Sequence, residues 1–392
     1  MFPLFKRVLH FQTFSRSSLR MAPCCRIIGF GGNKWIKGRN QLEGKKYIGF
    51  VGTYTKKESK GIYSFVLDAE KGKIEDVKNV AEIGSPTYLA ISEDNRYLYA
   101  VAKEGDKGGL AAYRIHREKN ELEEINRQLA DGPSPCYVAV DRACRLVMSA
   151  NYHKGTVDAY WTRDDGGLHP IAFTVQHEGS GPDKDRQEKA HVHFAGFTPD
   201  ERYIITVDLG IDRLDTYEWR DGQLHEVSSL GVKPGSGPRH LAFHPNGRIA
   251  YLMTELSSEV IVLKYDRDHG SFSEVQYIST IPEGYSQTNQ GSAIHVSSDG
   301  RFVYAANRGH NSIVIFRTDE KTGCLTYVDH VPTEGNWPRD FVLDPSEQYL
   351  VAANERSGNL TLFKRDPETG GLSLRQAGIS VPEAVCVKFF HD

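Results

Sequence analysis

Residues 238–251 read Pro238-Arg-His-Leu-Ala-Phe-His-Pro-Asn-Gly-Arg-Ile-Ala-Tyr251. This stretch holds a short apolar run, a polar turn with Asn-Gly, and a second run of apolar and aromatic residues. Two such runs around an Asn-Gly turn are typical of a β-hairpin. The same pattern, with Asp or Asn in the polar turn, occurs five more times, in copies that begin at Pro86, Pro135, Val192, Gly291 and Pro338.

The spacing of these copies predicts the architecture. They recur every 44 to 57 residues or so, which is a period typical of β-propellers. Further strand-like segments follow each hairpin, for example residues 312–316 and 323–327, so each copy has about four strands. A helical repeat of this length would show apolar residues at 3.6-residue spacing, and that spacing is missing.

A seventh copy is split between the two ends of the chain. Residues 47–53 match a second strand and residues 61–66 a third, while residues 382–387 match a first strand. The N- and C-terminal strands would then share one blade, which closes the ring without an open sheet edge. We therefore predict an all-β fold over residues 45–392: a seven-bladed β-propeller with four-stranded antiparallel blades.

Composition excludes several classes of protein. The net charge of -3 gives no basic field for nucleic acid. No window approaches eighteen consecutive apolar residues, so we expect no membrane span. None of the six cysteines forms a Cys-x-x-Cys pair, which argues against a disulfide scaffold or a zinc ribbon. We expect a cytoplasmic protein without nucleic-acid or membrane partners, either a monomer or a weak homodimer.

The first 44 residues differ from the rest. They hold eight Lys and Arg residues, and the first acidic residue is Glu43. We expect residues 1–44 to be a disordered leader outside the fold. Sequence upstream of a start at Met21 is one alternative, and an organellar transit peptide is another, since such peptides are basic and poor in acidic residues.

The hairpin of each blade has a constant length that defines a ring of positions. The first strand starts and the second strand ends at the same rim, because the two strands are antiparallel. The residue after the start of the phrase and the residue just past the second strand are sixteen apart in all six contiguous copies. The pairs are Thr87/Lys103, Cys136/Tyr152, His193/Leu209, Arg239/Glu255, Ser292/Arg308 and Arg339/Glu355, and the split blade adds Glu383 and Thr53. These fourteen residues should encircle one mouth of the central channel.

Five of the ring residues form the strongest candidate site: His193, Arg239, Glu255, Arg308 and Arg339. A carboxylate and an imidazole beside guanidinium groups are able to deprotonate water and stabilise an oxyanion. The same arginines suit a phosphate or a carboxylate as bidentate partners. The alternative is structural, with arginine and glutamate forming ion pairs that brace neighbouring strands.

Other histidines allow further interpretations. His191 and His193 lie two residues apart on one strand and, with Asp208, could bind a metal. No further Cys or His cluster supports zinc, so we expect no metal. His240 and His295 fall inside the first strands, and we predict both to be buried, hydrogen-bonded histidines.

Four phrases resemble the lactonase family of seven-bladed propellers, which includes bacterial 6-phosphogluconolactonases and fungal carboxymuconate cyclases. They are residues 51–54, 237–246, 307–312 and 337–340, and the resemblance covers nearly everything from Tyr47 to Phe390. It implies that His193, Arg239, Glu255 and Arg308 occupy the family's active-site positions, with Arg339 an additional arginine at the rim. The leader before residue 44 is a departure from the family pattern.

The resemblance implies a function: hydrolysis of 6-phospho-D-glucono-1,5-lactone to 6-phosphogluconate in the pentose phosphate pathway, without a cofactor. We expect Glu255 to be the general base, with His193 as the competing candidate, and Arg239 to stabilise the oxyanion. Arg308 and Arg339 would hold the phosphate. His191, Asp208 and Asn307 are additional candidates for contacts with the substrate.

Two other functions remain open. One is an enzyme acting on muconate-type lactones, in which the same arginines would hold carboxylates. The other is a non-catalytic propeller that serves as a platform for protein interactions, which the fold supports equally well.

Overall fold

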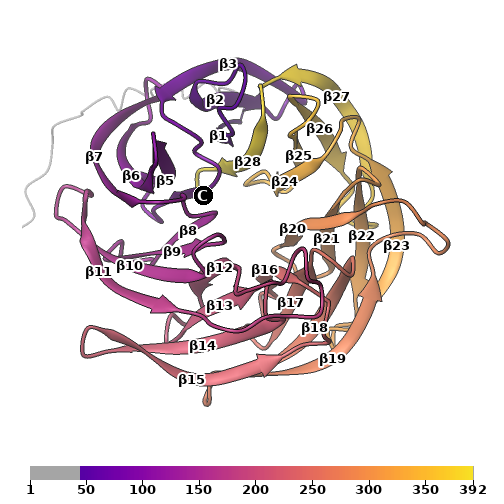
Figure 1. Cartoon of the computed structure of the whole chain (residues 1–392). Helices are drawn as coiled ribbons and strands as arrows, with labels where there is room; N and C mark the ends of the chain where they lie inside the picture. Colours follow the sequence, from indigo (N-terminus) through magenta and orange to yellow (C-terminus); the bar gives the residue numbers. More distant parts are fainter. Residues whose placement is uncertain (1–44, 392) are drawn as a thin grey trace, which may run out of the picture. The chain divides into compact units, whose positions relative to one another are not determined.

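The computed structural model describes residues 45–391. The described part contains 28 β-strands and no helix, hence no helix long and apolar enough to cross a membrane. The strands form seven four-stranded antiparallel sheets, arranged as blades around a central axis (Figure 1). The predicted seven-bladed β-propeller is confirmed. The leader expected at residues 1–44 lies outside the described residues.

The blades are numbered by their order around the ring. Within each blade, the four strands are named from the innermost strand, next to the axis, to the outermost (Figure 1). Blade 1 contains β28 (Ala384–Phe389), β1 (Lys46–Thr53), β2 (Gly61–Asp68) and β3 (Lys73–Glu82). Blade 2 contains β4 (Leu89–Ile91), β5 (Tyr97–Glu104), β6 (Lys107–His116) and β7 (Glu121–Asp131). Blade 3 contains β8 (Tyr137–Val140), β9 (Leu146–Asn151), β10 (Thr156–Thr162) and β11 (Leu168–Gln176).

Blades 4 to 7 follow the same order. Blade 4 contains β12 (Val192–Phe197), β13 (Ile204–Asp208), β14 (Arg213–Arg220) and β15 (Gln223–Gly231). Blade 5 contains β16 (Pro238–Phe243), β17 (Ile249–Thr254), β18 (Glu259–Asp266) and β19 (Ser271–Ser279). Blade 6 contains β20 (Gln290–Val296), β21 (Phe302–Arg308), β22 (Ser312–Thr318) and β23 (Leu325–Pro332). Blade 7 contains β24 (Pro338–Leu343), β25 (Tyr349–Asn354), β26 (Asn359–Arg365) and β27 (Leu372–Ser380).

The hydrophobic core is divided among the seven interfaces between blades. Each interface holds one cluster of buried apolar side chains, drawn from two consecutive blades. The second strands supply many of these residues, and β9, β17 and β25 are buried along their whole length. No blade can bury both faces alone, so the ring has to close for all seven clusters to form.

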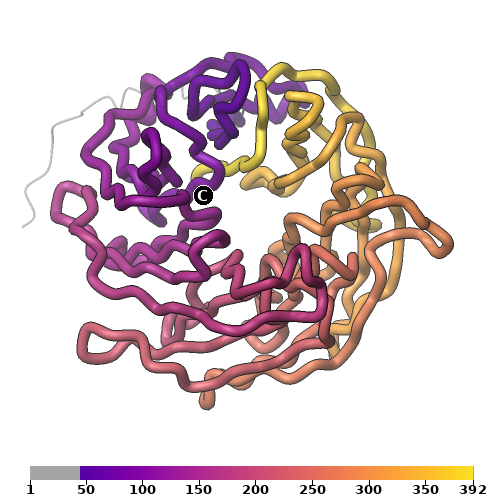
Figure 2. Tube along the Cα trace, in the orientation of Figure 1, coloured from indigo at the N-terminus to yellow at the C-terminus, as the bar shows by residue number. Residues whose placement is uncertain are grey.

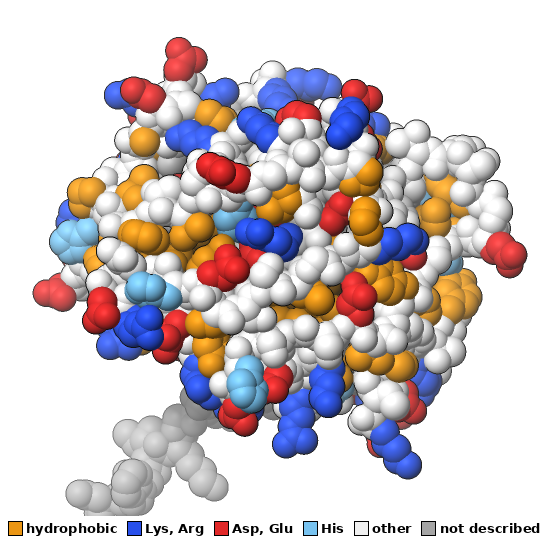
Figure 3. All heavy atoms as spheres, turned by 60° about the horizontal axis from the view of Figure 1, so that its bottom comes forward, with side chains coloured by type: hydrophobic (Ala, Val, Ile, Leu, Met, Phe, Trp, Pro, Cys, Tyr) orange, Lys and Arg blue, Asp and Glu red, His pale blue; other side chains and the backbone are white. Residues whose placement is uncertain are grey.

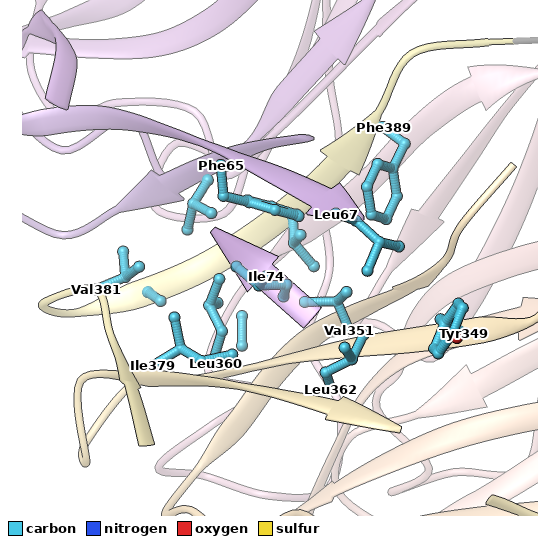
Figure 4. Close-up of a cluster of buried hydrophobic side chains, with 14 residues drawn as sticks. Phe65, Leu67, Ile74, Tyr349, Val351, Leu360, Leu362, Ile379, Val381 and Phe389 are labelled. Atoms are coloured by element: carbon cyan, nitrogen blue, oxygen red, sulfur yellow. The ribbon is translucent and has the colours of Figure 1, made fainter. Parts of the chain in front are cut away.

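The two ends of the chain close the ring in blade 1. The Cα trace passes once around the ring and brings its last strand beside its first (Figure 2). β1 pairs antiparallel with β28, from Gly49 opposite Phe389 to Thr53 opposite Ala384. Behind this pair, Phe65 packs edge-on against Phe389 with ring centroids 5.3 Å apart, and both belong to the cluster shared by blades 7 and 1 (Figure 4). The predicted split blade is therefore confirmed.

Candidate active site

One mouth of the channel opens into a cavity of about 730 Å³, lined by residues from all seven blades. This volume falls within the roughly 300–1,000 Å³ typical of small-molecule sites. Nine of the fourteen predicted ring positions line it: Thr87, Lys103, Cys136, Tyr152, His193, Arg239, Glu255, Arg308 and Arg339. The other five do not line it: Thr53, Leu209, Ser292, Glu355 and Glu383.

A β-bulge at the start of the innermost strand turns three of the candidate side chains toward the cavity. In β12, Val192 and Phe194 pair with consecutive residues of β13, so His193 is the extra residue. Arg239 is the extra residue in β16, and Arg339 in β24. Bulges re-aim a side chain at the end of a ladder and are common beside active sites. The bulge explains how the side chains of His193, Arg239 and Arg339 reach the cavity.

Glu255 is the centre of a buried ion cluster. Its Oε2 accepts hydrogen bonds from Arg239 Nε at 3.1 Å and from Arg308 Nη2 at 2.6 Å, and its Oε1 accepts one from Arg186 Nη2. Burial disfavours the charged carboxylate, but the guanidinium groups of Arg308 and Arg239 outweigh it and hold the pKa of Glu255 well below its usual range. Glu255 is therefore ionised, and both of its oxygens are occupied.

His193 lies beside this cluster without joining it. Its side chain is buried, and Nδ1 has no hydrogen-bond partner within residues 45–391. Burial and the nearby Arg239 guanidinium lower the pKa of His193 well below its ordinary value. The imidazole is thus neutral near pH 7 and keeps a lone pair free to accept a proton.

The three arginines differ in how firmly they are held. Arg239 also donates to the carbonyl of Ser292 at 2.8 Å, and Arg308 to that of Gly291 at 2.7 Å. Burial and the neighbouring Arg308 lower the pKa of Arg239 to about 9, so it remains charged at neutral pH. Arg339 makes no contact with Glu255, and its Nη1 lies 3.5 Å from Oε2 of Glu355.

The structure does not bring His191, Asp208 and Asn307 to the cavity. His191 stacks on Tyr152 and bonds to its carbonyl at 2.7 Å. Asp208 accepts from the backbone of His191 and Gly210. Asn307 donates to the carbonyl of Thr280 at 2.6 Å. All three hold strand ends and connections between blades, which leaves no side-chain atom for a substrate in the cavity.

The metal alternative at His191, His193 and Asp208 finds no matching geometry. His191 Nε2 lies 3.1 Å from Glu188, and Asp208 pairs with Nδ1 of His177 at 2.9 Å. In the part of the chain that the structure describes, no group of three or more His, Cys, Asp or Glu residues is arranged to hold a metal ion.

The family model for "Lactonase, 7-bladed beta-propeller" matches residues 48–389, which is nearly the whole ring. The chain belongs to this lactonase family. It is 53% identical over 347 residues to the 6-phosphogluconolactonase of Bacillus subtilis, and the match covers 88% of this chain and 99% of the relative.

Solved structures of related proteins have the same architecture. A protein from Lactobacillus plantarum is 43% identical and superposes with a TM-score of 0.85, over 88% of this chain and 99% of its own. The periplasmic gluconolactonase PpgL of Pseudomonas aeruginosa is 31% identical, with a TM-score of 0.83 over 88% of this chain and 99% of its own.

Several residues that line the cavity lie outside the predicted ring positions, and Arg186 is the one among them that contacts Glu255. Arg186 lies in residues 177–191, the longest connection between blades, which runs from β11 of blade 3 to β12 of blade 4. In Figure 1 this connection crosses toward β17, consistent with the contact between Arg186 and Glu255. The fully buried Gln187 anchors it by donating to the carbonyl of Leu209 at 2.8 Å. The only sequence signal is an unusually long, charged connection.

The histidines inside the first strands differ from each other. His240 is buried, as predicted, but it also lines the cavity, where Arg239 Nη1 approaches its Nε2 at 3.2 Å. His295 is only partly buried, with its ring 4.9 Å from that of Phe341 on the neighbouring blade. The prediction that His295 is buried was therefore wrong.

Proposed function

We propose that this chain hydrolyses 6-phospho-D-glucono-1,5-lactone to 6-phospho-D-gluconate. The observation that carries the proposal is the charge of the cavity. Six cationic side chains line it, and Glu255 is the single carboxylate among the lining residues; the cations are Lys56, Lys103, Arg186, Arg239, Arg308 and Arg339. On the outer face drawn in Figure 3, by contrast, charges of both signs are interspersed. A cavity with such an excess of cations favours a substrate with a dianionic phosphate.

In the first step, a water molecule attacks the lactone carbonyl carbon, and its proton passes to His193. The negative charge that develops on the carbonyl oxygen lies next to Arg239 and Arg308. Both guanidinium groups are already fixed by Glu255 and by backbone carbonyls, so they need no rearrangement as the charge forms. Preorganised donors of this kind supply a large part of the rate enhancement in acyl transfer.

In the second step, the tetrahedral intermediate collapses and the bond between the carbonyl carbon and the ring oxygen breaks. The ring oxygen takes the proton from the imidazolium of His193 and becomes a hydroxyl group. The product carboxylic acid then loses a proton to water. These steps use only water and side chains, since an ester carbonyl is already electrophilic.

This mechanism assigns the base differently from our expectation at the sequence level. Glu255 is poorly placed to accept a proton because both of its oxygens already accept hydrogen bonds from guanidinium groups. His193 is neutral and has a free lone pair, and Glu255 lies close enough to stabilise the imidazolium that forms. We therefore propose His193 as the base and Glu255 as the residue that positions the arginines.

The test is a pH-stat assay, because hydrolysis of the lactone releases acid. Rates are compared for 6-phosphogluconolactone, gluconolactone and a muconolactone, after subtraction of spontaneous hydrolysis. We expect the highest kcat/KM for the phosphorylated lactone. A preference for the muconolactone would support the carboxylate-binding alternative. Failure to accelerate any of the three would leave the interaction platform as the better interpretation.

A further inference from the structure

The charged residues that line the cavity fall into two groups by blade, which we call two walls. The Glu255 wall consists of His193, Arg239, Glu255 and Arg308, from blades 4, 5 and 6. The Tyr54 wall consists of Tyr54, Lys56, Lys103 and Arg339, from blades 7, 1 and 2. Blade 3 separates them on one side. Since the first wall holds the residues for the acyl chemistry, the second is free for another part of the substrate.

The aromatic ring of Tyr54 contacts two cationic side chains of its wall, those of Lys56 and Arg339. The Nζ of Lys56 lies 3.9 Å from the ring centroid, and the guanidinium carbon of Arg339 lies 5.4 Å from it. An aromatic face favours nearby cations, so the ring can hold both groups in place without neutralising their charge. Lys103, on the next blade, adds a third cation at the same mouth.

The loop that carries Lys56 is held by Glu383, which directly precedes β28 in blade 1. The backbone amides of Lys56 and Lys57 donate to Oε1 and Oε2 of Glu383 at 3.1 and 2.9 Å, and the amide of Tyr54 donates to its carbonyl at 3.0 Å. The carboxylate of Glu383 therefore binds the backbone of the loop and does not pair with the side chain of Lys56. The position of Lys56 at the mouth depends on the junction between the two ends of the chain.

No carboxylate of the cavity lining belongs to the Tyr54 wall. The nearest candidate, Glu355, does not line the cavity and lies 3.5 Å from Arg339 Nη1. A phosphate bound on the Glu255 wall would lie close to the carboxylate of Glu255, and the two negative charges would repel each other. Arg308, which the sequence grouped with Arg339 as a phosphate ligand, lies on the Glu255 wall and is already bound to Glu255.

Resting on the proposed function, we propose that Tyr54, Lys56, Lys103 and Arg339 form the subsite that binds the phosphate of the substrate. The lysines and Arg339 donate to the phosphate oxygens, and Tyr54 holds Lys56 and Arg339 in reach. The lactone carbonyl then lies toward His193, Arg239 and Arg308. The Tyr54 wall thus determines specificity for phosphorylated over unphosphorylated lactones.

The first experiment compares Lys56→Gln and Arg339→Gln with the wild-type chain on 6-phosphogluconolactone and gluconolactone. We expect the ratio of kcat/KM for the phosphorylated to the unphosphorylated lactone to fall about tenfold in each variant, which corresponds to about 1.4 kcal/mol. The change should arise in KM, because the phosphate contact is the same in ground and transition states. Lys57→Gln is the matched control, since Lys57 is the exposed neighbour of Lys56 and does not line the cavity.

A second readout is independent of the lactonase reaction. Inorganic phosphate should bind the wild-type chain in calorimetry, and Lys56→Gln should weaken this binding about tenfold. A ratio that stays at the wild-type value in Lys56→Gln and Arg339→Gln would overturn the subsite. If the wild-type chain hydrolyses no lactone, the proposed function fails, and phosphate binding by wild type and Lys56→Gln still decides whether the subsite exists.

Discussion

The two walls of the cavity contain the same type of charged group under opposite conditions. On the Glu255 wall, the side chains of Arg239 and Arg308 are each 3% exposed and bind one carboxylate. On the Tyr54 wall, Arg339 is 19% exposed and only loosely paired, and the two lysines are exposed. A buried, fixed cation suits a charge that develops at one point, whereas an exposed cation suits a mobile phosphate. Under the proposed function, the difference in burial distinguishes the arginines that stabilise the oxyanion from the cations that bind the phosphate.

Arg186 lies between these extremes. It contacts Glu255 like the buried arginines, but its side chain is 30% exposed and comes from a connection rather than a strand. If Arg186 moves away from Oε1 of Glu255, Oε2 still accepts hydrogen bonds from Arg239 and Arg308. The ion pair of Arg186 is therefore the least costly of the three to open.

The largest effect is expected when both walls are lost together. A chain ending at Ser380 lacks β28, so it exposes the clusters that β28 shares with blades 1, 2 and 7 and leaves β1 as an open edge. Removing a single buried aromatic residue already costs about 3–5 kcal/mol. We expect the loss of cooperative thermal unfolding, measured by circular dichroism. A melt identical to that of the full chain would contradict ring closure by the terminal strands.

The next largest effect tests the base on the Glu255 wall. His193→Gln should lower kcat about 100- to 10,000-fold, because general-base catalysis is lost. In the wild-type chain, kcat/KM for gluconolactone, which carries no phosphate that titrates in this range, should stay constant from neutral into acidic pH and fall only as His193 becomes protonated, since the pKa of His193 is well below the ordinary value. The variant should lack this acidic limb. If the limb persists unchanged in His193→Gln, another group is the base.

Arg239→Gln should lower kcat about 100- to 1,000-fold through loss of an oxyanion donor. An exposed ion pair would contribute only about 0–1 kcal/mol to stability. The ion pair is buried, however, and losing one partner of a buried pair costs up to about 3–5 kcal/mol. We therefore expect a lower melting temperature as well. Kinetics are measured well below the melting transition, with Arg239→Lys as the control that keeps the charge. Wild-type turnover in Arg239→Gln would show that Arg239 only braces the strands.

Glu255→Gln distinguishes a positioning role from a basic one. Without the carboxylate, Arg186, Arg239 and Arg308 repel one another and shift. Small misplacements of this kind cost about 100-fold in rate. We expect such a fall in kcat with the acidic limb of the pH profile retained, because His193 still titrates. Disappearance of the limb in Glu255→Gln would return the base role to Glu255.

The smallest effect is expected from deletion of residues 1–42. Within residues 45–391, the two walls and the seven core clusters are complete, and the repeat pattern does not extend into residues 1–42. The melting temperature and the specificity ratio between the two lactones should therefore stay within error of the full chain. A shift of several degrees in melting would show that our domain boundary is wrong.

The sequence by itself determined the ring. The repeated hairpin, its polar turns with Asp or Asn, and the split seventh copy predicted the blades and their closure, because hairpins are set by local spacing and turn chemistry. The sixteen-residue spacing also brought His193, Arg239, Glu255, Arg308 and Arg339 to one mouth. This worked because each pair lies within one hairpin, where distance along the chain fixes distance in space.

Only the tertiary structure decided how these residues work. The partners of Glu255 in Arg308 and Arg186 are 53 and 69 positions away along the chain, on other blades and connections. Their contacts depend on how blades pack, which no local pattern encodes. The same holds for Lys56, which reaches the cavity from a loop held by Glu383, 327 positions away. Burial and charge pairing, which determine whether Glu255 or His193 is the better base, arise only when the ring closes.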